Sequence, residues 1–368
     1  MKGHVLLGTM LSIGLVAWLL YQVDFQQLSQ TLQSAHYSYM ILATGAILST
    51  YVVRSWRWQY ILQPVKPVAL TSLISATGIG FMVNMLLPAR AGELARAYVI
   101  GHKEQMSTVV SLASIVVERV VDLVSLLLLI IPLLGLSSLS PHHTAITSSL
   151  QTAGLFVVLV CLAAIAFLWH LTSKPRTTLT WLAVGLRLVP RKWRHAAREG
   201  LQSFTSALQA LRCSQHVAPI TLLSLAIWGL QALSNWLIFL SFDLQLPPLS
   251  AFFILFVQTV GVMIPSSPGF IGTYHASVIA GLGYFGVPHD LALGVAISMH
   301  AVFFFPCIGV GFIFLWSESL SLRQLRTSVR RHPTAGQTAL QQSDRVIDQR
   351  ASVLSSASLP DGNRQGEG

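Results

Sequence analysis

Three ionisable residues lie inside a stretch that is otherwise apolar. Glu118, Arg119 and Asp122 fall within residues 107–135, which are rich in Val, Leu and Ile. On a helix, Glu118 and Asp122 share one face, and Arg119 is three residues from Asp122. Each charge at the centre of a bilayer costs about 2.5–3.5 kcal/mol on insertion scales. These residues therefore predict a buried charge network that faces other helices, serving function or serving structure alone.

A second group of charges follows a helix breaker. Residues 68–87 are apolar and run directly into PARAGELAR, residues 88–96. Arginine makes bidentate contacts with phosphate, and a helix beginning after Pro88 would direct its positive end toward an anion. The segment predicts a binding site for an anionic lipid headgroup. Its candidate residues are Asn84, Arg90, Glu93 and Arg96.

The two charged groups are expected to pair with each other. Arg90 or Arg96 could neutralise Glu118, and Glu93 could pair with Arg119. By contrast, Arg54 and Arg57 alternate with Trp56, Trp58 and Tyr60. Arginines among aromatic residues are typical of a membrane interface, so we expect these two to mark the cytoplasmic surface.

A second interrupted segment occurs at residues 254–276. Its prolines and glycines force an open backbone, and Ser266, Ser267 and Gly269 could present hydroxyl and N–H groups to a headgroup. His275 could titrate near neutral pH and couple transport to protons. The alternative for His275 is a purely hydrogen-bonded histidine. Gln258 and Tyr274 are expected polar neighbours of this turn.

The composition shows which elements must position these residues. Hydrophobic residues make up 53% of the 368-residue chain and charged residues 10%, against about 25% charged residues in soluble domains. The fold class is therefore an all-α polytopic membrane protein. The three cysteines form no metal or redox motif, no P-loop occurs, and no metal or other cofactor is expected. The net charge of +10 reflects cytoplasmic loops rather than nucleic-acid binding.

Charge counting gives a topology. Apolar stretches of spanning length occur at 5–21, 38–53, 107–135, 150–171, 218–241 and 291–316. Lys and Arg collect at 54–66, 172–217 and after 316, which places these segments and both termini in the cytoplasm. Residues 67–106 and 251–287 must then each cross an even number of times, as hairpins entering from opposite sides. We expect about six full spans plus two broken, re-entrant hairpins in an inverted repeat, about eight membrane helices in all. The alternative is that both hairpins only pack the bundle.

The domain organisation follows. Residues 1–320 form the integral membrane domain, beginning with an uncleaved anchor, and 172–217 is its basic cytoplasmic loop. Within this loop, 187–212 predicts an amphipathic helix on the lipid surface or packed on the bundle. Residues 321–368 predict a disordered cytoplasmic tail.

Four motifs occur here in a familiar order. They are RSWRWQYIL (54–62), NMLLPARAGELAR (84–96), ERVVD (118–122) and IPSSPGFIGTY (264–274). They resemble the flippase-like membrane proteins related to the transmembrane region of bacterial lysylphosphatidylglycerol synthase, over roughly residues 1–320. Two positions depart from the family pattern: Phe270 replaces a glycine and His275 replaces a glutamate.

The resemblance implies a lipid flippase of the bacterial inner membrane. Its substrate would be a phospholipid or a modified anionic or aminoacylated lipid, and its partners membrane lipids, a second copy or a lipid-modifying enzyme. No soluble aminoacyltransferase domain is expected. Two alternatives remain open. The chain could be an enzyme or enzyme partner in envelope lipid or polyprenyl-phosphate biosynthesis, with Glu93, Glu118 or Asp122 as general base, or a scaffold acting through its tail.

Overall fold

The computed structural model describes residues 25–87, 90–134, 159, 214–263 and 267–318. These residues are helical apart from short connections, and no strand occurs among them. The predicted span at 5–21, the predicted span at 150–171 except for residue 159, the tail at 321–368 and Ser266 lie outside the described residues. The predicted loop 172–217 also lies outside them, except for its last four residues, which begin a helix.

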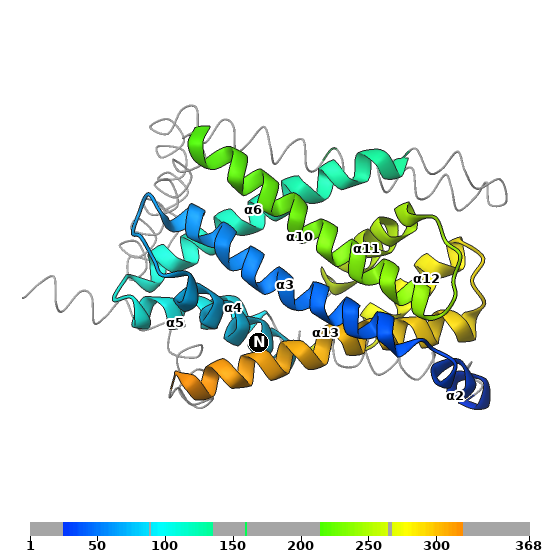
Figure 1. The fold of residues 1–368 in the computed structure, drawn as a ribbon. Helices are drawn as coiled ribbons and strands as arrows, with labels where there is room; N and C mark the ends of the chain where they lie inside the picture. Colours follow the sequence, from blue (N-terminus) through cyan, green and yellow to red (C-terminus); the bar gives the residue numbers. More distant parts are fainter. Residues whose placement is uncertain (1–24, 88–89, 135–158, 160–213, 264–266, 319–368) are drawn as a thin grey trace, which may run out of the picture.

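The described helices follow the order predicted from the apolar segments (Figure 1). They are α2 (Phe25–Gln33), α3 (Tyr37–Leu62), α4 (Leu70–Leu86), α5 (Ala91–Lys103), α6 (Thr108–Leu134), α10 (Ser214–Ser241), α11 (Pro248–Met263), the short 3-10 helix η4 (Pro268–Phe270), α12 (Thr273–Tyr284) and α13 (His289–Ser317).

Two described helices combine the length and hydropathy of a membrane span: residues 216–241 of α10 and α13. Helices α3 and α6 are also long, with 26 and 27 residues, but each carries charged side chains. The described part is therefore an all-helical arrangement with apolar helices, in agreement with the expected fold class.

The first predicted hairpin is α4 followed by α5. Leu87 leaves α4 in an extended conformation, and Arg90 adopts the left-handed conformation (φ 52°, ψ 39°) immediately before α5. Helix α5 begins at Ala91, and Pro88 lies outside the described residues. The two helices cross where Gly80 faces Gly92. A Cβ on Gly92 would lie 1.8 Å from the Gly80 carbonyl oxygen, so only glycine fits there.

The second predicted hairpin is α11, η4 and α12. Gly269 (φ 73°) and Phe270 (φ 58°) have left-handed backbones, and Gly272 (φ 96°) precedes α12. His300 of α13 fixes this turn, because its Nε2 lies 2.8 Å from the Gly269 carbonyl oxygen.

The two halves of the described chain interlock. Helices α3 and α10 lie side by side and antiparallel, with the His36 N–H donating to the Ser241 carbonyl at one end (Figure 1). Helix α4 packs on α13, and α11 packs on α6. The η4 turn contacts the end of α4, where Gly269 approaches Met85. The tips of the two hairpins therefore meet inside the bundle.

Candidate functional site

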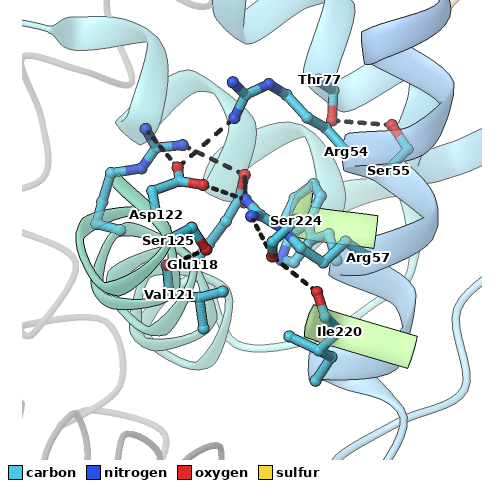
Figure 2. Close-up of polar contacts among 12 residues, drawn as sticks. Arg54, Ser55, Arg57, Thr77, Glu118, Val121, Asp122, Ser125, Ile220 and Ser224 are labelled. Atoms are coloured by element: carbon cyan, nitrogen blue, oxygen red, sulfur yellow. Dashed lines mark hydrogen bonds and ion pairs between the residues drawn. The ribbon is translucent and has the colours of Figure 1, made fainter. Parts of the chain in front are cut away.

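A cluster of ion pairs joins α3, α5 and α6 in the interior. Glu118 is completely buried, and both of its carboxylate oxygens face arginines. Oε2 lies 2.9 Å from Arg96 Nη2, while Oε1 lies 3.3 Å from Arg57 Nη2 and 3.3 Å from Arg119 Nη2. The predicted pair of Arg96 with Glu118 is thus present. Figure 2 shows Glu118 and Asp122 of α6 facing Arg54 and Arg57 of α3.

Asp122 extends the cluster by one helical turn. Its Oδ1 lies 2.7 Å from Arg57 Nη2. This contact is an ion pair without the geometry of a hydrogen bond. Its Oδ2 lies 3.2 Å from Arg119 Nη1 and 3.6 Å from Arg54 Nη1. Arg57 also donates to the Ser224 hydroxyl of α10 at 3.0 Å, so the cluster ties a fourth helix (Figure 2).

The expectation that Arg54 and Arg57 mark the membrane surface was wrong. Arg57 has no exposed surface, and Arg54 is 9% exposed. Both side chains turn inward because Glu118 and Asp122 lie opposite them on α6. The sequence contained a signal for this burial. Glu118 and Asp122 were expected to be buried, and buried carboxylates require buried cationic partners.

Arg96 is buried behind the cluster rather than in an open site. Its guanidinium carbon lies 4.2 Å from the centre of the Trp58 ring, and Trp58 donates to the Ser114 hydroxyl at 2.9 Å. Arg96 Nε and Nη1 have no hydrogen-bond partner among the described residues. The face of an aromatic ring attracts a desolvated cation, which offsets part of this deficit.

The cluster carries an excess of positive charge. Four arginines and three carboxylates meet in it, because Glu93 joins through Arg119, with its Oε1 3.7 Å from Arg119 Nε. The predicted pair of Glu93 with Arg119 is therefore present. The charged members are Arg54, Arg57, Arg96, Arg119, Glu93, Glu118 and Asp122.

A cavity of about 500 Å³ opens beside the cluster. Its walls come from both hairpins and from α3, α6, α10 and α13. Three arginines and two carboxylates reach it: Arg54, Arg90, Arg119, Glu93 and Asp122. The neutral polar residues that line it include Thr50, Tyr51, Asn84, Gln231, Ser234, Asn235, Gln258, Thr259 and Tyr274. Its volume lies within the range usual for ligand pockets.

The residues predicted for headgroup binding divide in two. Asn84, Arg90 and Glu93 line the cavity, whereas Arg96 lies in the buried cluster. The Asn84 side-chain oxygen accepts a 2.7 Å hydrogen bond from the Gly92 N–H, so it also caps the start of α5. Arg90 is exposed, and among the described arginines it alone forms no ion pair. A free guanidinium at the cavity wall suits an anion.

In the second hairpin, Phe270 of the turn lines the cavity, whereas Ser267, Gly269 and His275 do not. The Ser267 hydroxyl donates to the Ile271 carbonyl at 3.2 Å, and Gly269 is buried against Phe304. The His275 ring packs against the His300 ring, with their centres 4.8 Å apart. These residues therefore hold the turn together, while Gln258 and Tyr274 of the same hairpin reach the cavity.

Three polar residues of α10 line the cavity but were not predicted from the sequence. Gln231, Ser234 and Asn235 recur at the spacing of one helical face, i, i+3 and i+4, within an apolar span. That spacing places all three on the cavity wall.

In the part of the chain that the structure describes, no group of three His, Cys, Asp or Glu side chains could hold a metal ion.

Comparison with known proteins identifies the same family that the sequence motifs resemble. A model of the lysylphosphatidylglycerol synthase transmembrane region matches residues 5–311. Glycosyltransferase AglD of Haloferax volcanii is 23% identical over 81% of this chain and 52% of the relative. A UPF0104 membrane protein of Methanocaldococcus jannaschii is 24% identical over 64% of this chain and 93% of the relative. Another, from Methanothermobacter thermautotrophicus, is 22% identical over 87% and 97%. The chain thus spans about half the length of the glycosyltransferase.

Proposed function

Because this chain belongs to the family of the lysylphosphatidylglycerol synthase transmembrane region, we propose that it moves a lipid between the leaflets of its membrane. The phosphate of the headgroup binds in the cavity between the hairpins. The observation that carries this proposal is the surplus of arginine over carboxylate at the cavity wall. A positive surplus in a partly apolar cavity attracts an anion and disfavours a cation.

Arg90 is the residue that contacts the phosphate in this proposal. Arg54 and Arg119 already face carboxylates, whereas Arg90 has none within ion-pair distance among the described residues. The left-handed backbone at Arg90 places this arginine at the break between α4 and α5, beside the cavity. Strained backbone of this kind is often found at ligand sites.

The arrangement of the helices supports a transport pathway. The order α3, hairpin, α6 is repeated as α10, hairpin, α13, and we propose that the two units are an inverted repeat with re-entrant hairpins. Transporters of this architecture bind substrate where broken helices meet. We place the chain in the cytoplasmic membrane with both termini inside, following the distribution of Lys and Arg.

A second function is favoured by one relative. The chain is 23% identical to a protein named as a glycosyltransferase, so it could be a membrane partner of envelope lipid synthesis or carry out such synthesis. Against catalysis by the cluster, Glu93, Glu118 and Asp122 all face arginines. A carboxylate held in ion pairs is a poor general base.

The test is lipid movement in proteoliposomes. Purified protein is reconstituted with a fluorescent phosphatidylglycerol, and the outer leaflet is quenched chemically. We expect the protected inner pool to fall with the native protein. Arg90→Ala should slow the movement about ten- to a hundredfold, since a hydrogen bond to a charged group contributes about 1.5–3 kcal/mol.

Lys103→Ala is the matched control. Lys103 is the last residue of α5, the helix that follows Arg90, and it pairs with Glu318, away from the cavity. It removes the same charge and should leave the rate unchanged. Equal rates for the native and Arg90→Ala proteins would contradict the assignment of Arg90, and an unchanged inner pool in every vesicle would contradict lipid movement.

A further inference from the structure

The cavity wall has two chemically different parts. All five charged residues that line it come from α3, α5, α6 and the turn before α5, and this part is named the charged end. The part that comes from α10 and the second hairpin has no charged residue and is named the neutral end. Its polar residues are Gln231, Ser234, Asn235, Gln258, Thr259 and Tyr274. A ligand that fills the cavity therefore meets charged groups from one set of elements and uncharged hydrogen-bonding groups from the other.

The charged end offers nothing to a cationic headgroup. Both carboxylates that reach the cavity already face arginines: Glu93 lies 3.7 Å from Arg119, and Asp122 lies 2.7 Å from Arg57. An ammonium group would have to displace a guanidinium or approach uncompensated arginines. His275, the other candidate at this hairpin, packs against His300 and does not line the cavity.

The neutral end offers both donors and acceptors. The Gln258 side-chain oxygen accepts from the Tyr274 hydroxyl at 3.3 Å, which leaves the Gln258 amide N–H groups for a ligand. Gln231 donates to the Ile227 carbonyl at 3.3 Å, which leaves its side-chain oxygen as an acceptor. A hydroxyl group both donates and accepts, so paired carboxamides match a polyol better than an alkyl or ammonium group.

We infer that the cavity selects a lipid whose phosphate carries a neutral, hydroxylated headgroup, a polyol or a sugar, over an aminoacylated lipid. This inference rests on the proposed function, because it concerns the lipid that the same site moves. It narrows the substrates implied by the family resemblance, which included aminoacylated lipids. The phosphate binds at Arg90, and the hydroxyl groups bind at Gln231 and Gln258.

The experiment compares three fluorescent lipids in the proteoliposomes described above: phosphatidylinositol, phosphatidic acid and lysylphosphatidylglycerol. We expect phosphatidylinositol to move at least about tenfold faster than lysylphosphatidylglycerol, the factor that 1.4 kcal/mol provides. Gln258→Leu should slow phosphatidylinositol about tenfold more than phosphatidic acid, which has no hydroxylated headgroup. If Gln258→Leu does not fold, Gln231→Leu makes the same comparison.

The outcomes separate this inference from the proposed function. Equal or faster movement of lysylphosphatidylglycerol would overturn the inference while lipid movement itself stands. No movement of any lipid would overturn both. A further arm measures uptake of soluble inositol phosphate, which shares the same chemistry. Uptake of that solute without movement of phosphatidylinositol would show that the site serves a free phosphate ester and would overturn the lipid assignment.

Discussion

Replacing Glu118 with Gln is expected to destabilise the folded protein by about 3–5 kcal/mol, because it leaves buried arginines without their counter-charge. Glu118 is fully buried and faces Arg57, Arg96 and Arg119. Two nitrogen atoms of Arg96 already have no hydrogen-bond partner in the part of the chain that the structure describes. The amide cannot compensate three guanidinium groups. The measurement is the thermal unfolding midpoint in detergent, together with the yield of monodisperse protein.

Two further variants make this prediction specific. Glu104→Gln is the control. Glu104 lies between α5 and α6, is only partly buried and forms no ion pair among the described residues. The thermal unfolding midpoint of this variant should therefore match that of the native protein. The double variant Glu118→Gln, Arg96→Met should recover part of the lost stability, since it also removes one stranded cation. A native midpoint for Glu118→Gln alone would show that the cluster does not stabilise the fold.

The Gly92→Ala protein is expected to lose the crossing of α4 and α5. The new Cβ would lie 1.8 Å from the Gly80 carbonyl oxygen and 2.6 Å from the Asn84 side-chain oxygen. Backbone cannot yield as a flexible side chain does, so the two helices must separate, at a cost at or above the upper end of the usual range of about 1–3 kcal/mol for overpacking. Separation also removes the Asn84 cap of α5 and displaces Arg96.

Gly229→Ala is the matched control for this prediction. Gly229 lies within α10, and nothing lies within 4 Å of its added Cβ. Alanine favours a helix over glycine by about 1 kcal/mol, so this variant should be as stable as the native protein or slightly more stable. Both proteins are compared by thermal unfolding in the same detergent. Equal midpoints for Gly92→Ala and Gly229→Ala would contradict the close crossing.

The helical hairpins could be predicted because the sequence breaks them visibly. A helix breaker and a run of charges end the segment at residues 68–87, and Gly269 and its prolines interrupt the segment at 254–276. The parity of the positively charged loops predicts an even number of crossings for each hairpin, and this topology stays a prediction. The ion pairs of Arg96 with Glu118 and of Glu93 with Arg119 followed from the same reasoning, because charges in an apolar bundle need partners.

The partners of Asp122 could not be predicted in the same way. Arg54 and Arg57 lie among aromatic residues, a pattern that an interface and an interior site share. What separates the two cases is which face of α3 meets α6, and that depends on packing between segments about 60 residues apart. The antiparallel contact of α3 with α10 sets this orientation and also brings Ser224 to Arg57.

The neutral end of the cavity was missed for a different reason. Single polar residues in a span are often satisfied by their own helix, as the Gln231 bond to Ile227 illustrates. Only the shared face of Gln231, Ser234 and Asn235 indicates a common surface, and only the fold places that surface in the same cavity as charged residues of the cluster. The enclosing walls come from α3, α4, α5, α6, α10, α11, η4, α12 and α13, and no local pattern specifies their meeting point.

The most direct test of the central claim is to block the cavity chemically. The three natural cysteines are replaced, and Thr259→Cys introduces a thiol at the cavity wall, while Gln63→Cys places one at the exposed end of α3, in the predicted cytoplasmic segment, as the control. Both proteins are treated with a bulky charged thiol reagent, and movement of a fluorescent phosphatidylinositol is measured in proteoliposomes. We predict that modification at residue 259 stops the movement and that modification at residue 63 leaves it unchanged. Full modification at residue 259 with an unchanged rate would contradict the claim that the headgroup passes through this cavity.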